Sequence, residues 1–317
     1  TRSGVYWIAT NGGGVARLNA SIGSHATNQA QSHSRFTVYS MSNDAVTNRV
    51  NILFEDSVGA LWAGTDGGLF RMDLAQGEQE FHSVDLKIPS LSDLSVQVWS
   101  FVEGTDGSLW IGTKFGLVHR LADGRMIHYQ VQLETTDTVS SLLRDNDGNI
   151  LLAHERGIIA FNPKPEMETK TEGRSLKVEP GRRYSQGNRP EIRSRVLFRS
   201  SSGRIWATEP GHGLSFFDGQ DFQPYPIDKA QDLTGPIGED REGNLWLAVD
   251  SGAMRIAMQG FTTYDSDDGL GPALSSVFES PSGELFVSGK WQISRLDGNR
   301  FVTVRFNLPK SVTDTFW

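Results

Sequence analysis

The side chains best suited to chemistry gather at one repeated position of this chain. Each follows, by three to six residues, a large apolar residue that recurs along the sequence. Histidine beside a carboxylate can move a proton or bind a metal ion, and an exposed tryptophan suits stacking on a sugar ring or a base. The candidate ligand-binding residues are His154, Glu155, Arg156, Glu209, His212, Asp250, Lys290 and Trp291.

Each candidate also has a purely structural explanation. The two histidines suit loop positions at which a polar ring satisfies neighbouring groups. Glu155 and Arg156 suit a solvated ion pair, and Lys290 suits a solvated charge. Trp291 stands where other copies carry a small or charged residue, and its ring suits packing against the next repeat as well as stacking on a ligand.

No motif for catalysis or cofactor binding accompanies these residues. HExxH, GxSxG, a P-loop and an EF-hand loop are all absent, and no helix pattern follows the glycine run at residues 12–14. The string at residues 145–148 begins like a calcium loop, but it lacks the later glutamate and coincides with a turn of the repeat. We therefore expect no catalytic residue, no metal and no cofactor.

The candidates are positioned by a repeat that is written most fully at residues 59–71 as GALWAGTDGGLFR. A glycine stands three residues before a large apolar residue seven times, at spacings of 55, 48, 41, 55, 40 and 40 residues. These spacings favour the four-stranded blades of a β-propeller over helical repeats, which need a long 3.6-residue apolar period. The seven pairs are Gly4/Trp7, Gly59/Trp62, Gly107/Trp110, Gly148/Leu151, Gly203/Trp206, Gly243/Trp246 and Gly283/Phe286.

Each copy of the repeat predicts four short strands. In the second copy, apolar residues alternate over residues 50–54, the chain turns back at Gly59, and residues 61–65 are apolar or small on both faces, as a strand packed on each side requires. A third strand at residues 69–72 and a strand of the Phe-x-x-Tyr type complete the copy. Six copies keep the fourth strand, and the fourth copy matches it poorly around residues 176–178.

We therefore predict a single all-β domain over residues 1–317, a seven-bladed β-propeller of four-stranded antiparallel blades. The expected blades are 4–41 with 311–317, then 48–86, 96–131, 139–180, 193–227, 234–265 and 274–306.

The two ends of the chain predict how the ring closes. Val312, Asp314 and Phe316 repeat the first-strand pattern, and their spacing to Gly4, counted across the two ends, equals the spacing within the second copy. The C-terminal segment is expected to pair as the innermost strand of the blade that begins at the N-terminus. A piece cut from a longer array of repeats would show the same pattern, and we expect a fragment of a longer protein.

Two polar segments interrupt the repeat and account for the two spacings of 55 residues. Residues 19–35 and residues 163–190 contain few large apolar side chains and predict long surface loops. Both a functional and a merely mobile role stay open for them.

Composition excludes several classes of partner. The chain carries 30 Lys and Arg against 38 Asp and Glu, a net charge of -8 without a basic run, so neither nucleic acid nor membrane contact is expected of this segment. The sequence contains no apolar stretch of about 18 residues, so it predicts no membrane helix. With 0 cysteines the chain has no disulfide and no thiolate metal site, and its redox compartment cannot be inferred.

The repeats GALWAGTDGGLFR, GSLWIGTKFGLVHRL and GNLWLAVDSGAMRI resemble the two-component regulator propeller repeat of bacterial signalling proteins. The resemblance covers nearly the whole chain. It implies a periplasmic or extracellular sensory module that stands next to a second propeller or a β-sandwich domain, in a full-length protein that can form a homodimer. Kinase or cyclase output would lie outside this chain.

Three functions remain open. The first is a non-catalytic ligand-binding sensor that recognises a small molecule or an oligosaccharide on the upper rim, the face that carries the loops between second and third strands. The second is a lyase similar to streptogramin lyases, in which a histidine and a carboxylate would act with a divalent cation near the axis. The third is a protein-interaction platform that uses residues 19–35 and 163–190.

Overall fold

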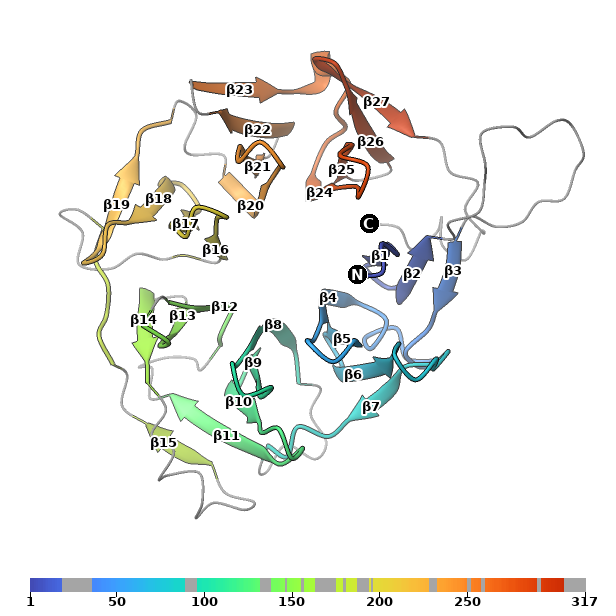
Figure 1. The fold of residues 1–317 in the computed structure, drawn as a ribbon, viewed down its shortest axis with the longest axis vertical. Helices are drawn as coiled ribbons and strands as arrows, with labels where there is room; N and C mark the ends of the chain where they lie inside the picture. The colour runs from blue at the N-terminus through green and yellow to red at the C-terminus, as the bar shows by residue number, and fades with distance from the viewer. Residues whose placement is uncertain are drawn as a thin grey trace, which may run out of the picture.

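The fold is a ring of seven β-sheets arranged around a central axis (Figure 1). The computed structural model describes residues 1–18, 36–88, 96–131, 138–145, 147–154, 157–162, 175–178, 181–186, 194, 196–227, 233–249, 252–257, 260–289 and 292–304. In these ranges the only helix is a 3-10 turn, η2, at Ser266–Asp268. The chain is therefore the all-β, seven-bladed propeller with antiparallel blades that the repeat predicted.

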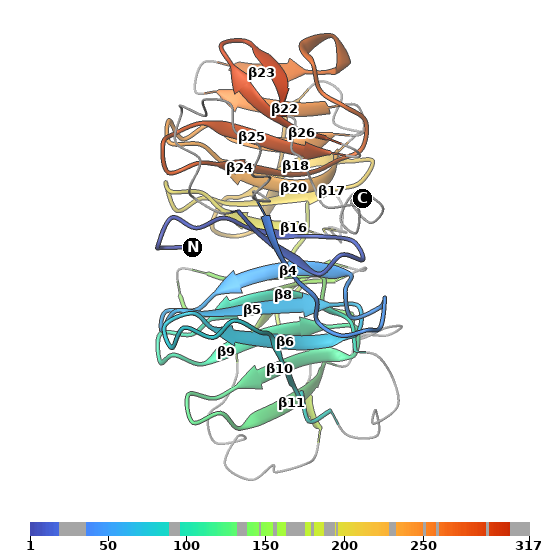
Figure 2. The same cartoon turned by 90° about the vertical axis from the view of Figure 1, so that its right-hand side faces the viewer.

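Within each blade, consecutive strands pair antiparallel, and each lies farther from the central axis than the strand before it (Figure 1). Figure 2 shows the ring from its edge. Blade 1 contains β1 (Trp7–Ala9), β2 (Val15–Leu18) and β3 (Phe36–Tyr39); blade 2 contains β4 (Val50–Glu55), β5 (Ala60–Thr65), β6 (Gly68–Asp73) and β7 (His82–Val84). Blade 3 contains β8 (Val98–Glu103), β9 (Leu109–Thr113), β10 (Gly116–Arg120) and β11 (Met126–Val131); blade 4 contains β12 (Ser141–Arg144), β13 (Ile150–His154) and β14 (Gly157–Phe161). Blade 5 contains β16 (Val196–Arg199), β17 (Ile205–Glu209), β18 (Gly213–Phe217) and β19 (Phe222–Tyr225); blade 6 contains β20 (Leu233–Glu239), β21 (Leu245–Val249), β22 (Gly252–Ala257) and β23 (Gly260–Tyr264). Blade 7 contains β24 (Leu274–Glu279), β25 (Leu285–Gly289), β26 (Gln292–Asp297) and β27 (Arg300–Val304).

The anchor glycines form the same turn in all seven blades. Each has a positive φ, between 77° and 90°, which side-chain-bearing residues resist. The amide of each donates a hydrogen bond to the carbonyl three residues earlier, at 2.8–3.3 Å. The glycine spacing is therefore a direct record of where each first strand turns into its second strand.

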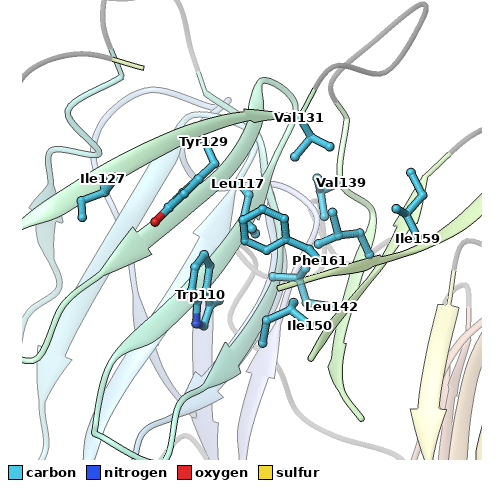
Figure 3. Close-up of a cluster of buried hydrophobic side chains, with 11 residues drawn as sticks. Trp110, Leu117, Ile127, Tyr129, Val131, Val139, Leu142, Ile150, Ile159 and Phe161 are labelled. Atoms are coloured by element: carbon cyan, nitrogen blue, oxygen red, sulfur yellow. The ribbon is translucent and has the colours of Figure 1, made fainter. Parts of the chain in front are cut away.

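The hydrophobic core lies between neighbouring blades. The second strands β5, β9, β13, β17 and β21 are buried along their full length, because a neighbouring sheet covers each face. Figure 3 shows one such layer, in which Trp110 and Tyr129 of blade 3 pack against Phe161 of blade 4. The tryptophans of the repeat are core residues, as most large aromatic side chains are.

The outer strand of blade 4 departs from the repeat. The segment with the poor fourth-strand match, β15 (Leu176–Val178), pairs in parallel with β11 and so becomes a fifth strand of blade 3. Residues 182–184 take its place beside β14, where the Ala160 amide donates to the Arg182 carbonyl and the Tyr184 amide donates to the Ile158 carbonyl. We call residues 175–178 and 181–186 the strap, because they run along blades 3, 4 and 5.

The first strands β4, β8, β12, β16, β20 and β24 form the inner wall of the ring, with neighbours in contact from β4 round to β24 (Figure 1). Blade 1 has no strand at this inner position among the described residues, and its second strand β1 lies next to β4 instead. The predicted closing segment, residues 311–317, lies outside the described residues, as does the loop at residues 19–35.

Candidate functional site

The upper rim is built on a threonine at the end of the second strand in the first three blades. The hydroxyls of Thr10, Thr65 and Thr113 each donate to the carbonyl of the glycine that opens the third strand, at 2.8–3.0 Å. Each hydroxyl also accepts a backbone amide of the same loop at 3.0 Å. The threonine therefore closes the loop that forms the rim, and we call this arrangement the threonine latch.

Blades 4 and 5 place ionisable residues at the latch position. His154 ends β13 opposite Gly157, and Glu209 ends β17 opposite Gly213. Both side chains are only 1% exposed. Of the eight predicted site residues, these two thus lie buried at the ends of the second strands of neighbouring blades.

His212 behaves differently, since it is exposed on the loop after β17 and its amide donates to the Glu209 carbonyl at 3.0 Å. The structure brings His212 and Glu209 onto one loop, with one side chain in solvent and the other in the interior. The other predicted site residues lie outside the described residues; they are Glu155, Arg156, Asp250, Lys290 and Trp291.

A polar cluster on the rim of blades 2 and 3 was not predicted as a site. The Asp66 carboxylate accepts hydrogen bonds from the Asn51 amide at 3.1 Å and the Gln97 amide at 3.3 Å. Arg49 lies 3.9 Å from the same carboxylate, with half of its side chain exposed. Asp66 occupies the position after the latch threonine, so counting from the repeat finds it, but its partners come from first strands and their entry loops.

A cavity of about 620 Å³ lies beside blade 1, between blades 7 and 2. Its lining is mostly apolar and includes Tyr6, Trp7, Phe278 and Ile293, with hydroxyl and amide groups from residues such as Ser288. Burial raises the pKa of Tyr6 above its usual value. The cavity lies beside β1, between the first strands β24 and β4, and none of its lining residues was predicted as a site.

The described part of the chain holds no group of three or more His, Asp or Glu side chains arranged for a metal ion. In the same residues no helix is both long enough and apolar enough to cross a membrane.

No known family and no curated protein matches the sequence. Solved structures match its fold. A streptogramin B lyase is 13% identical, with 94% of this chain and 91% of that chain covered and a TM-score of 0.67. A virginiamycin B lyase from Staphylococcus aureus, solved with quinupristin, is 14% identical over 82% and 84% of the two chains, with a TM-score of 0.62.

The structural neighbours also include extracellular domains of two-component systems. That of the hybrid two-component system BT4673 from B. thetaiotaomicron is 19% identical over 96% of this chain and 47% of that chain, with a TM-score of 0.41. At such identities the likeness to all these structures concerns the fold alone. The chain is thus a seven-bladed propeller, and its structural neighbours include lyases and extracellular domains of two-component systems.

Proposed function

We propose that this chain is a non-catalytic, extracytoplasmic sensor module that binds a small molecule or an oligosaccharide at the upper rim of blades 4 to 7. The observation that carries the proposal is the replacement of the threonine latch by His154 and Glu209, both buried at the rim. The sensory and extracytoplasmic parts of the proposal rest on the resemblance of the repeats to those of two-component regulator propellers.

The replacement places ionisable side chains at a buried position. A threonine in this position closes its loop with two short hydrogen bonds, whereas a buried carboxylate or imidazole must be desolvated and then satisfied by partners. Local rules of a repeat are usually broken where function requires it. Blades 4 to 7 all lack the threonine, with Val249 and Gly289 at this position in blades 6 and 7, and the two blades that carry ionisable groups there are neighbours. Their adjacency favours a shared binding surface at His154 and Glu209.

The chemistry of the rim suits a polar ligand. Blade 5 places the exposed His212 three residues after the buried Glu209, and the ring of His212 can both donate and accept hydrogen bonds. The sequence repeat assigns residues 155, 156, 250, 290 and 291 to the corresponding loops of blades 4, 6 and 7, and their side chains include both charges and an indole. Such a set fits a sugar better than an apolar molecule.

A thermal-shift screen of the purified chain against oligosaccharides, amino acids, nucleotides and divalent cations tests the proposal. A ligand at about a hundredfold excess over its Kd stabilises the folded form by about 2.7 kcal/mol. His154→Thr and Glu209→Thr restore the residue that the repeat uses, so we expect both variants to stay folded and to lose the ligand-induced shift. Thr113→Ala changes the same position of blade 3 and serves as the matched control, which keeps the shift.

Two results would count against this proposal. A ligand whose shift survives in both threonine variants binds elsewhere, and loss of the shift in Thr113→Ala as well would point to a general loss of rim structure. Turnover of a bound compound that stops when a chelator is added would instead support the lyase that the sequence leaves open.

A further inference from the structure

Another cavity lies on the lower face of the ring, which is the face opposite the upper rim. It measures about 200 Å³ and lies between blades 1 and 2. One side is lined by the turn that leads into β1 and by residues of β1, β2 and β3, and the other side is lined by the loop between β6 and β7. Pockets for drug-sized ligands measure about 300–1,000 Å³, so this cavity suits a smaller molecule.

Arg17 supplies the positive charge of this cavity. It pairs across the hairpin with Trp7, and its guanidinium lies over the indole ring, 5.7 Å from the centroid. Arg71 occupies the same position in blade 2, where its guanidinium pairs with the Asp73 carboxylate at 2.9 Å. Arg17 forms no ion pair in the part of the chain that the structure describes. The position that corresponds to Asp73 holds the uncharged Asn19 in the sequence.

Trp7 also lacks the acceptor that its counterpart in blade 2 has. The indole of Trp62 donates to the carboxylate of Asp56, six residues earlier, at 2.8 Å. In blade 1 that position holds Thr1, whose hydroxyl donates to the Val5 carbonyl at 2.8 Å. The indole N–H of Trp7 is buried and has no acceptor among the described residues. Blade 1 therefore lacks both of the carboxylates that hold this pair of side chains in blade 2, and a cavity adjoins the pair instead.

The other side of the cavity carries the carboxylate of Glu78. The Asp73 amide donates to one of its oxygens at 2.6 Å, and the Glu78 amide donates back to the Asp73 carbonyl at 3.0 Å. These two hydrogen bonds fix the carboxylate without neutralising its charge. Glu78 and Arg17 thus line one cavity as opposite charges, and in the described structure they form no ion pair with each other.

The lining also offers an apolar surface. The rings of Trp7 and Tyr39 lie against each other with centroids 5.2 Å apart, and Leu74 of blade 2 belongs to the same hydrophobic cluster. All three residues line the cavity. Burial against such a surface favours a ligand with an apolar part.

We propose that this cavity binds a free amino acid with an apolar side chain. The carboxylate of the ligand pairs with Arg17, and its ammonium group pairs with Glu78. Its side chain packs against the two rings and the leucine. A ligand with both charges neutralises both sides of the cavity, whereas a simple acid brings a second negative charge to Glu78 and a simple amine brings a second positive charge to Arg17. The site is separate from the upper rim, and neither proposal depends on the other.

Isothermal titration calorimetry of the purified full chain with L-valine, L-leucine and L-methionine tests the proposal. We expect saturable binding of at least one of them. The matching acid and the matching amine each lack one charged group; for L-leucine these are 4-methylpentanoate and 3-methylbutylamine. Each should bind at least about tenfold more weakly than the amino acid, because each loses a charged hydrogen bond.

Two variants of the cavity assign the charges of the ligand. Arg17→Gln should weaken amino-acid binding at least about tenfold. Glu78→Gln keeps an oxygen that can accept the Asp73 amide, and it should weaken amino-acid binding to a similar degree while leaving the affinity for the acid equal or higher. The matched control is Arg255→Gln, because Arg255 lies over Trp246 in the same way, at 5.8 Å, but does not line this cavity. It should keep the affinity of the unsubstituted chain.

Four results would overturn the proposal. They are no binding of any of the three amino acids, an equal loss in Arg255→Gln, a loss of affinity for the acid in Glu78→Gln, and amino-acid binding that survives both cavity variants but disappears in His154→Thr or Glu209→Thr. The last result would place the amino acid at the upper rim. If Arg17→Gln does not fold, Glu78→Gln and the two analogues still decide the outcome.

Discussion

Blade 2 and blade 5 have the same backbone turn between their first and second strands, but different side chains form hydrogen bonds to the tryptophan that follows it. In blade 2 the Asp56 carboxylate accepts from the indole of the buried Trp62 at 2.8 Å and from the Ala60 amide at 2.8 Å. In blade 5 a serine replaces the aspartate, and the Trp206 indole lies 3.4 Å from the Ser200 hydroxyl. Glycine turns and alternating apolar residues determine the structure of each blade, whereas the side chain that accepts the hydrogen bond of the tryptophan indole differs between blades.

The largest expected effect comes from the Asp56 cap. Asp56→Ala leaves a buried indole and a buried amide without an acceptor, and we expect a loss of about 2–4 kcal/mol in the free energy of unfolding. Ser200→Ala removes a weaker contact and should cost about 1 kcal/mol or less. Denaturant unfolding of both variants measures the difference, and equal losses would contradict the contrast between the two blades.

A smaller effect is expected at the threonine latch. Thr113→Ala removes the hydroxyl that joins the Gly116 carbonyl to the Phe115 amide in blade 3, which should cost about 1 kcal/mol. Glu209→Thr adds such a hydroxyl to blade 5, so its free energy of unfolding should equal or exceed that of the unsubstituted chain. A clear destabilisation by Glu209→Thr would show that the glutamate holds the rim together, and it would weaken the case for a binding role.

The smallest effect concerns pH and the turn of blade 3. The hydrogen bond from the Ser108 hydroxyl, at 2.6 Å, is the main cause that holds the pKa of Asp106 below its usual value. A lowered folded-state pKa stabilises the fold above the unfolded pKa of about 3.9, and this stabilisation is lost as the pH falls through the folded pKa. The melting temperatures of the unsubstituted chain and of Asp106→Asn should therefore converge on acidification. A gap that widens at low pH would contradict this sign.

The sequence predicted the blades well because the residues of the repeat have strong local conformational preferences. All seven anchor glycines form the turn that their spacing indicated, and the tryptophans beside them are buried or partly buried. These features depend on neighbours within one hairpin. A single copy of the repeat contains all the information that they need.

The parts that the sequence did not predict depend on contacts between distant segments. The pairing of β15 with β11 is parallel and joins residues about 47 positions apart, and the weak alternation at residues 176–178 does not indicate which blade it belongs to. The burial of His154 and Glu209 follows from the neighbouring blades, which their own hairpins do not reveal. The cavity of about 620 Å³ is lined by residues of blades 1, 2 and 7, which only the closed ring brings together.

The strap adds contacts between blades on one side of the ring only. Tyr184 is buried between blades 4 and 5, where it meets Phe217 and Phe222 edge to face with centroids 5.4 and 5.9 Å away, and the Phe222 amide donates to the Ser185 carbonyl. Blades 3 to 5 are thus fastened together from outside, on the side of the ring away from blade 1. Because the strap joins blades 3 to 5 along their outer edges, we expect these three blades to separate from one another later on heating than blades that no such segment crosses.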